Sequence, residues 1–366
     1  MTEIKYRAGS QILMSQTETP RIIQLGSTRD MSDRMQRIGT ILLIIAALAV
    51  TAWWTAALAI AGPAPAGIRY ATAAGYAVVM AAVLLLVRPL PRALAVWGVA
   101  FVAVLLWWNS IHPSNDRVWQ PDVARLPSVE IQGEQLIVKN LRNFEYRSET
   151  DFTPHYEQRV YDLGKLRGLD LFMSYWGSPA IAHTIMSWQF EGSPPLAISI
   201  ETRKHMGQTY SAVQGFFKQY ELIYVVADER DVVRVRTNFR GEHVYLYRLA
   251  APLREVRALL MDYVASMNAL IDQPSFYNAL ADNCTTRIRR HVKHINPGAP
   301  PFDFRLLANG YADRLLYERG SLDTGLPFET LRAQSLIDAK AKAANDDPAF
   351  SERIREGLPN PRVRSK

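Results

Sequence analysis

The sequence has very little cysteine: Cys284 is the only one among 366 residues. One thiol cannot form an internal disulfide, which excludes a disulfide-stabilised fold. A free thiol in an oxidising compartment is a liability unless it is buried or used. Cys284 is therefore either a small buried hydrophobic residue, which is the commoner role of a lone cysteine, or a reactive nucleophile.

Acidic residues and lysine are absent from residues 38–111, where only three arginines carry charge. Three apolar runs lie within this stretch, at 38–61, 69–87 and 91–110. Each run reaches or approaches the roughly 20 residues that a helix needs to cross the hydrocarbon of a bilayer. Segments rich in Gly and Pro separate the runs. Residues 38–111 are therefore predicted to form three transmembrane helices.

The basic residues are unevenly distributed around these runs. Six of them lie in residues 1–37, and Arg88 and Arg92 lie between the second and third runs, whereas Arg69 alone lies between the first and second. Lys and Arg are enriched on the cytoplasmic side of transmembrane helices. This pattern predicts a flexible cytoplasmic tail at 1–37, and it predicts that the chain after the third span lies on the opposite side of the membrane.

A strong charge excess is missing from the rest of the chain. Five of the seven net positive charges lie in the first 110 residues. The remainder is close to neutral and lacks the basic stripe of a nucleic-acid-binding protein, so no nucleic-acid partner is expected. The sequence also contains no Gly-rich phosphate loop and no Gly-x-Ser-x-Gly motif, which argues against a nucleotide site and against a serine hydrolase of the α/β type.

After the third run the sequence divides into a linker at 112–128, a soluble domain at 129–330 and a charged tail at 331–366. Short segments of the domain alternate or concentrate apolar residues as strands do. These segments are 134–138, 158–163, 169–176, 181–190, 196–203, part of 216–226, 231–236 and 244–247. Helical spacing follows at 252–271 and from Cys284 onward. The predicted fold class is α+β, with an antiparallel sheet.

Cys284 follows Asp282 and Asn283, two residue types that start helices by accepting a hydrogen bond from a free N–H group of the first turn. The next ten residues contain no Gly or Pro and end in cations, as a helix C-terminus prefers. Cys284 is therefore predicted at a helix N-terminus, where free N–H groups and the helix dipole lower the pKa of a thiol. That position favours a nucleophile.

A cysteine nucleophile needs a base, and His183 is the one histidine of seven that lies in the middle of a predicted strand. The alternative interpretation is that His183 is a hydrogen-bonded histidine of the core with no catalytic role. Glu201 lies on the next predicted strand, where a carboxylate would orient the imidazole. The spacing of His291 and His294 is a weak metal signal because cations surround it. No metal and no cofactor are expected.

Four blocks of sequence together resemble the Lnb N-terminal periplasmic domain family. They are Ala182-His183-Thr184-Ile185, Ile198-Ser199-Ile200-Glu201-Thr202-Arg203, residues 220–238, and Phe276-Tyr277-Asn278 with Asn283-Cys284-Thr285-Thr286. The resemblance implies a periplasmic domain attached to the bacterial inner membrane, with a permuted, papain-like (NlpC-like) thiol enzyme fold and a cysteine-bearing helix. It implies that Cys284 is the nucleophile, His183 its base and Glu201 the third polar member. Asn283 would shape the oxyanion site, with the backbone N–H of Cys284 as the more direct donor.

The characterised branch of this family is a lipoprotein N-acyltransferase. By resemblance, the partners would be a phospholipid as acyl donor and a lipoprotein amine as acceptor. The name-giving protein has a C-terminal membrane portion, whereas this chain has its apolar runs at the N-terminus, so the identities of donor and acceptor stay open. Two alternatives also stay open: a cysteine hydrolase (amidase or peptidase) of the cell envelope, and a non-catalytic envelope protein with an inert, buried Cys284.

Overall fold

The computed structural model describes residues 28–299, 301, 303–322 and 324–361. The chain divides into two compact units, one formed by residues up to 56 with 73–102 and the other by 57–72 with 103 onward. The predicted tail at 1–37 lies outside the described residues as far as residue 27. Its last ten residues are described, and they are helical.

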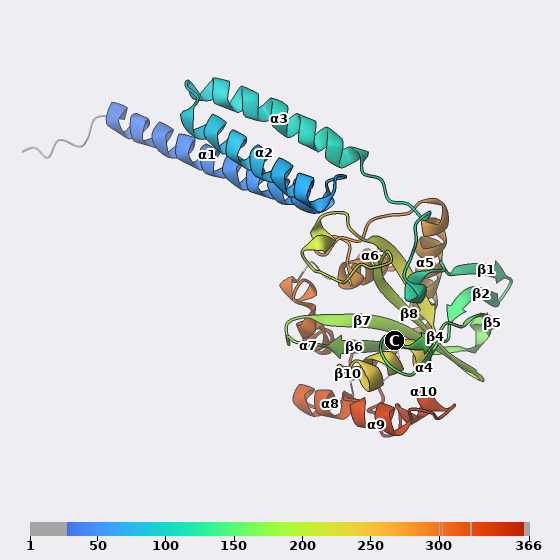
Figure 1. Ribbon diagram of the computed structural model, residues 1–366. Helices are drawn as coiled ribbons and strands as arrows, with labels where there is room; N and C mark the ends of the chain where they lie inside the picture. The colour runs from blue at the N-terminus through green and yellow to red at the C-terminus, as the bar shows by residue number, and fades with distance from the viewer. Residues whose placement is uncertain (1–27, 300, 302, 323, 362–366) are drawn as a thin grey trace, which may run out of the picture. The chain divides into compact units, whose positions relative to one another are not determined.

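Three long helices begin the described chain: α1 (Thr28–Ala61), α2 (Ala66–Leu86) and α3 (Leu90–Ser110) (Figure 1). All three are long and apolar enough to cross a membrane, which confirms the prediction of transmembrane helices. α1 begins ten residues before the first apolar run because residues 28–37 contain no Gly or Pro and include three Arg and two Met, which favour helix.

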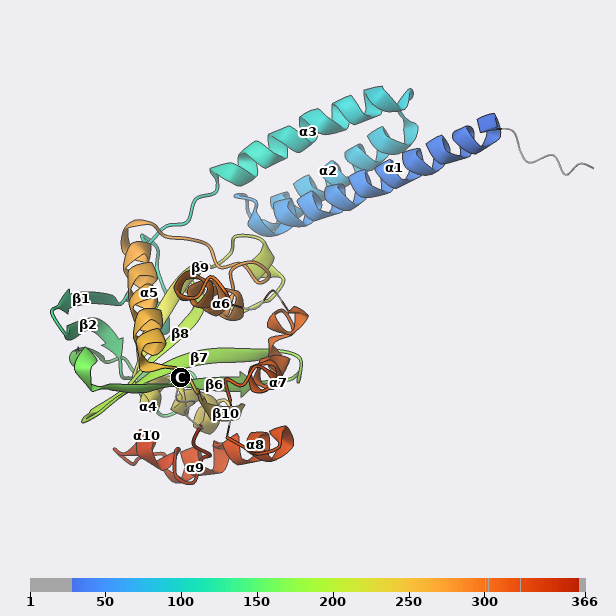
Figure 2. The same ribbon diagram turned by 180° about the vertical axis from the view of Figure 1, so that it is seen from behind.

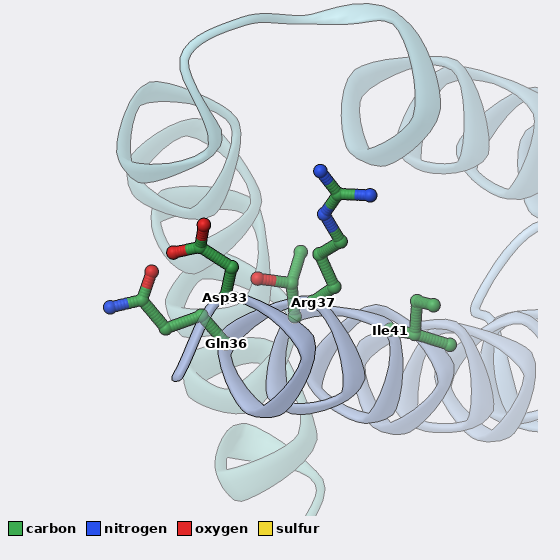
Figure 3. Close-up of a pocket in the computed structure, with 5 residues that line it drawn as sticks. Asp33, Gln36, Arg37 and Ile41 are labelled. Atoms are coloured by element: carbon green, nitrogen blue, oxygen red, sulfur yellow. The ribbon is translucent and has the colours of Figure 1, made fainter. Parts of the chain in front are cut away.

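A hollow on the N-terminal unit is lined by residues of α1 alone (Figure 3). These residues are Asp33, Gln36, Arg37, Thr40 and Ile41. Since they follow one another along one stretch of a single helix, the hollow is the space between neighbouring side chains. It holds none of the residues that the sequence predicts to carry chemistry.

The second unit is built on an eight-stranded sheet in the order β1-β2-β9-β8-β7-β6-β10, with β5 paired to β2. The strands are β1 (Ser128–Gln132), β2 (Gln135–Arg142), β5 (Tyr156–Asp162), β6 (Leu166–Tyr175), β7 (Ala182–Phe190), β8 (Ser193–Arg203), β9 (Glu221–Ala227) and β10 (His243–Arg248). A small separate sheet joins β3 (Glu145–Tyr146) to β4 (Phe152–Thr153). The fold is therefore α+β, as predicted.

The sheet is mixed, which corrects the prediction of an antiparallel sheet. Arg142 of β2 pairs in parallel with Ala227 of β9, while the other strand pairs among the described residues are antiparallel. Parallel neighbours need a long crossover, and here β5 to β8 lie between the two strands in sequence. Alternation of apolar and polar residues along a strand predicts which face of the strand is buried. It does not predict whether a partner strand distant in sequence runs parallel or antiparallel.

Helices cover both faces of the sheet, as Figures 1 and 2 show. On one face lie α5 (Leu253–Asp272) and α6 (Cys284–Ile295). Trp188 anchors this face: its ring packs 5.1 Å from that of Tyr263, and its indole N–H donates to the carbonyl of Val256 at 3.0 Å. On the other face lie α4 (Glu229–Val232), α9 (Asp338–Ala343) and α10 (Phe350–Arg353). The helices α7 (Ala312–Glu318) and α8 (Phe328–Ser335) lie between these groups in sequence.

The strand predicted at 231–236 is wrong. This segment forms α4 and a π-helical turn, η4 (Val235–Phe239). The β-branched valines suggested a strand, but Asp228 caps a helix by accepting the N–H of Arg230 at 2.9 Å. Asp231 is fully buried against Arg142. Tertiary contacts here override the local preference.

The charged tail predicted at 331–366 is also wrong as far as residue 361, beyond which the chain lies outside the described residues. Ile337, Phe350 and Ile354 are fully buried in the core of the second face. Arg355 is held by carboxylates of Asp170 and Glu229. The apolar residues recur every three or four positions, which is helical spacing, but the many charges around them conceal this pattern.

The predicted linker at 112–128 is fixed to the second unit. Asn115 donates from Nδ2 to the carbonyls of Leu270 and Ile271, each at 2.9 Å. Arg203 donates to Oδ1 of Asn115 at 2.9 Å and to the carbonyl of Val123 at 3.0 Å. The chain between the third helix and β1 is therefore part of the folded domain, attached at the C-terminal end of α5.

Candidate active site

Cys284 is the first residue of α6, and the helix begins there because Asn283 caps it. Asn283 Oδ1 accepts the N–H of Thr286 at 2.9 Å, and Thr286 Oγ1 accepts the N–H of Asn283 at 2.9 Å. This reciprocal capping box leaves the first N–H groups of the helix, including that of Cys284, without an intrahelical acceptor. The thiol is 6% exposed. A nearly buried sulfur thus lies where backbone dipoles favour negative charge.

His183 lies near the start of β7, and the strand register places it beside β8. Ile185 pairs with Ser199, so two residues further along the antiparallel ladder His183 faces Glu201. The Ser199 hydroxyl donates to Glu201 Oε1 at 2.7 Å, so Nε2 of His183, which lies 2.6 Å from Ser199 Oγ, is the donor of that second hydrogen bond. The same Oε1 lies 3.5 Å from Nε2. Ser199 therefore links the imidazole to the carboxylate.

The imidazole of His183 also hydrogen bonds the side chain of Cys284. Since Nε2 is directed at Ser199 and Glu201, Nδ1 is the ring nitrogen available to the sulfur. The structure thus brings together Cys284, His183 and Glu201, which the sequence places 18 and 83 residues apart. A thiol, a base and an orienting carboxylate in this order form the arrangement that activates a cysteine nucleophile.

The electrostatics of the three side chains agree with this arrangement. Burial alone would raise the pKa of the Cys284 thiol, but the hydrogen bond and charge of His183 outweigh it and lower the pKa to about 7. Burial and the charge of Arg236 oppose protonation of His183, yet its contacts with Cys284 and Glu201 raise its pKa overall. Thiolate and imidazolium therefore stabilise each other near neutral pH.

Glu201 is kept ionised although it is buried. Burial would raise the pKa of its carboxyl group, but His183 and Arg236 hold that pKa well below its usual value. Arg236 donates to Glu201 Oε1 at 3.1 Å and to Glu242 Oε2 at 3.2 Å. Glu242 in turn accepts from the hydroxyl of Ser174. Arg236 lies on the π-helical turn that replaces the predicted strand, and it donates to the same carboxylate oxygen that accepts from Ser199.

Asn309 is a site residue that the sequence did not reveal. It lies in the short turn η6 (Asn309–Tyr311), where its side chain is almost fully buried. Its amide pairs with the backbone of Ala182, accepting the N–H at 2.9 Å and donating to the carbonyl at 2.5 Å. It also donates to Thr285 Oγ1 at 2.7 Å and lies 3.9 Å from the sulfur of Cys284. One side chain thus joins the residue before His183 to the residue after Cys284.

The backbone beside Asn309 makes an unusually close approach to the loop between β6 and β7. The N–H of Gly310 donates to the carbonyl of Ala180 at 3.0 Å, and its own carbonyl accepts from the hydroxyl of Tyr175 at 2.8 Å. A Cβ atom on Gly310 would lie 2.1 Å from the carbonyl oxygen of Pro179. Only glycine allows this turn to bring Asn309 into place.

Replacing Asn309 with alanine is expected to raise the pKa of the Cys284 thiol, because β7 and α6 lose the side chain that fixes their separation. The free energy of unfolding should fall by about 1–3 kcal/mol, since the buried N–H and C=O of Ala182 lose their partner. The measurement is the alkylation rate of Cys284 against pH in the full chain.

Asn268→Ala is the matched control, since Asn268 makes the same pair of bonds with Val129 at 2.9 and 2.8 Å. It should lose comparable stability with the thiol pKa unchanged. Equal pKa values in both variants and the parent chain would reduce Asn309 to a purely structural residue.

The remaining predicted positions have other tasks. The side chain of Asn283 is engaged on both sides, since its Nδ2 also donates to the carbonyl of Ala279 at 2.8 Å. Its role in the structure is to cap the helix, so the candidate oxyanion donor at that point is the backbone N–H of Cys284, the first residue of α6. His291 is buried and bonded through both ring nitrogens, to Asp262 at 2.6 Å and Tyr224 at 2.7 Å. In the part of the chain that the structure describes, no cluster of three metal-ligating side chains occurs.

Residues 152–310 match the family model described as the Lnb N-terminal periplasmic domain. The resemblance inferred from four sequence blocks is thereby confirmed over this span, which includes His183, Glu201 and Cys284 and extends just past Asn309. No curated protein and no solved structure matches the chain. The family match and the three apolar helices identify a membrane-associated periplasmic protein of the cell envelope.

Proposed function

Starting from a membrane-anchored domain of the Lnb type, we propose that this protein is a periplasmic cysteine acyltransferase. It moves a fatty acyl chain from a phospholipid to the amine of a lipoprotein through a thioester on Cys284. The observation that carries the proposal is the hydrogen-bonded series Cys284–His183–Ser199–Glu201 at the start of a helix. A thiol with a pKa of about 7 is about half ionised at pH 7, so a substantial share of Cys284 is present as the reactive thiolate.

The first half of the reaction forms the thioester. The Cys284 thiolate attacks the carbonyl carbon of the lipid ester, and the resulting oxyanion is stabilised by N–H groups at the start of α6. As the intermediate collapses, the bond to the glycerol oxygen breaks, and the His183 imidazolium gives its proton to that oxygen. A lysophospholipid leaves, and the acyl chain stays on the sulfur.

The second half transfers the acyl chain to nitrogen. A neutral amine attacks the thioester carbonyl, and the neutral His183 accepts a proton from the attacking nitrogen. The C–S bond then breaks, an amide is released, and the thiolate–imidazolium pair is restored. Glu201, held by Arg236 and Ser199, keeps the imidazole oriented and stabilises its positive charge in both halves.

Membrane attachment supports a lipid as the donor. A domain fixed to the bilayer meets phospholipid esters at high local concentration, because the enzyme and the donor are held in the same membrane. The domain has no charge pattern or phosphate loop suited to an activated, water-soluble acyl carrier. The lipoprotein amine as acceptor rests on the family resemblance.

The test uses the full chain in lipid nanodiscs containing phospholipid with a radiolabelled acyl chain. The expected result is label on the protein that hydroxylamine removes, as it removes a thioester, and that is absent from Cys284→Ser. Addition of a diacylated lipopeptide with a free N-terminal amine should discharge the label and increase the mass of the lipopeptide by one acyl chain.

Two other outcomes would assign the protein elsewhere. Label that is lost to free fatty acid equally fast with and without lipopeptide would indicate a hydrolase. No label at all, combined with a thiol that reacts only after unfolding, would indicate a non-catalytic envelope protein. Because the chain has one cysteine, each readout refers to Cys284 alone.

A further inference from the structure

Two loops beside Cys284 expose large apolar side chains to solvent. The loop between β8 and β9 exposes Met206, Tyr210 and Val213, and the segment leading to α6 exposes Leu280. Val213 is 58% exposed and Leu280 54%. We refer to these four side chains as the apolar rim. Contiguous exposed apolar groups on a soluble domain usually mark a surface that something else covers.

The two loops are joined to each other directly. The N–H of Ala279 donates to the carbonyl of Gly215 at 3.1 Å, and a Cβ atom on Gly215 would lie 3.2 Å from that of Ala279. The N–H of Tyr277 donates to the carbonyl of Tyr220 at 3.0 Å. Val213 and Leu280 therefore belong to one continuous surface and not to two unrelated turns.

The rim also lies next to the reactive sulfur. Leu280 is four residues before Cys284, and the carbonyl of Ala279 accepts from the side chain of Asn283 at 2.8 Å. Tyr210 hydrogen bonds Tyr277, and burial raises the pKa of both phenol groups, to which the charge of the nearby Cys284 thiolate adds. A chain seated on the rim would thus end at Cys284.

The segment that joins the third apolar helix to the domain is short, and its length indicates that the membrane covers the apolar rim. The third apolar helix ends at Ser110, and Asn115 is already bonded to the last turn of α5. Five residues span at most about 18 Å, whereas a domain of about 250 residues is roughly 45 Å across. The attached edge of the domain must therefore be the one near the bilayer.

That edge is the one that carries the rim. The N–H of Ser114 donates to a carboxylate oxygen of Glu221 at 3.3 Å, and Glu221 forms a bridge with Phe276. Phe276 is next to Tyr277, from which the chain runs through Leu280 to Cys284. The tether, the rim and the nucleophile are thus joined by a few residues near Glu221, where β9 begins.

We propose that the apolar rim inserts into the outer surface of the phospholipid bilayer, so that a lipid acyl ester reaches Cys284 without passing through water. The surface is a lipid-binding one in its own right. Its use for acyl supply rests on the proposed function. Tyr210 suits the interfacial level of a membrane, where an aromatic ring with a polar end is favoured.

The first test measures insertion without any use of activity. In the full chain with Cys284→Ala, a single new cysteine at Val213→Cys is labelled with an environment-sensitive fluorophore and placed in nanodiscs. The control label is at Val160→Cys on β5, which is 46% exposed and belongs to neither loop. Phospholipids with a nitroxide on the acyl chain are expected to quench the label at 213 and leave that at 160 bright. Equal quenching at both positions would overturn the proposal.

The second test measures acyl supply. Leu280→Glu is expected to reduce the rate of thioester formation from bilayer phospholipid about tenfold or more, because one buried leucine has an effect of that size. With a short-chain, water-soluble ester the rate should stay within about twofold, and Val160→Glu should leave both rates unchanged. A loss with both esters would mean that Leu280 shapes the site and not its access to lipid.

The two proposals fail in different ways. If no ester forms a thioester in the parent chain, the acyltransferase proposal fails, while quenching at position 213 still decides whether the rim contacts lipid. If thioester forms normally but position 213 is unquenched until a diacylated lipopeptide is added, the rim is an acceptor-binding surface and its bilayer role is refuted.

Discussion

Replacing His183 with alanine is expected to raise the pKa of the Cys284 thiol from about 7 to above its ordinary value. The imidazole supplies both the hydrogen bond and the charge that outweigh burial, and burial remains when it is gone. At pH 7 about half of the parent thiol is ionised, and the thiolate fraction in the variant should be lower by about 50-fold or more. Acyl transfer should fall by a factor of about 10²–10⁴, as for loss of a general base.

The measurement is the rate of alkylation of the full chain at a series of pH values. In the parent chain the rate should rise through pH 7, because the thiol loses its proton there. His291→Ala is the matched control, since it removes another buried histidine, on the same helix as Cys284 and bonded to Asp262 and Tyr224. An alkylation profile that is the same in the parent chain and in His183→Ala would return Cys284 to the role of a buried core residue.

The sequence predicts the residues of the site better than it predicts their supports. Cys284 could be placed because helix caps are local: Asn283 and the uninterrupted segment after it determine where α6 begins. His183 and Glu201 could be placed beside each other because strands joined by a short turn pair in register. Each inference needs only residues that are near in sequence.

Supports that come from distant segments leave little trace in the sequence. Asn309 acts on the backbone of Ala182, 127 residues away, and any residue type except proline at 182 would offer the same N–H and C=O. Arg236 was assigned to a strand because the valines around it favour one, whereas it lies on a helical turn directed at Glu201. The buried role of Asp231 had no local sign, since an acidic residue in a charged segment resembles an exposed turn.

Replacing Asp231 with alanine is expected to lower the free energy of unfolding by about 3–5 kcal/mol, the usual cost of leaving a buried charge unpaired. Asp231 is fully buried and accepts from the guanidinium of Arg142 at 2.8 Å and from the N–H of Phe144 at 2.8 Å. Both donors would lose their acceptor. The measurement is denaturant unfolding of the full chain in detergent, followed by tryptophan fluorescence.

Asp151→Ala is the control for this prediction, because it breaks an ion pair with Arg147 in which both side chains are more than half exposed. Such a pair contributes about 0–1 kcal/mol, so the control should unfold almost as the parent does. Similar small losses in both variants would contradict the burial argument.

Replacing both residues of the buried Arg142–Asp231 pair distinguishes what the pair contributes to the stability of the fold from its effect on the pKa values of the site. Arg142→Met combined with Asp231→Val should recover much of the stability lost in Asp231→Ala, since two apolar side chains replace an ion pair whose desolvation is costly. Burial raises the pKa of Glu201, and Arg142 helps His183 and Arg236 to hold it low. If the double variant unfolds like the parent and Cys284 keeps its alkylation profile, His183 and Arg236 suffice to keep Glu201 ionised without Arg142. A recovered fold with a raised thiol pKa would instead make Arg142 part of the support that reaches Cys284 through Glu201 and His183.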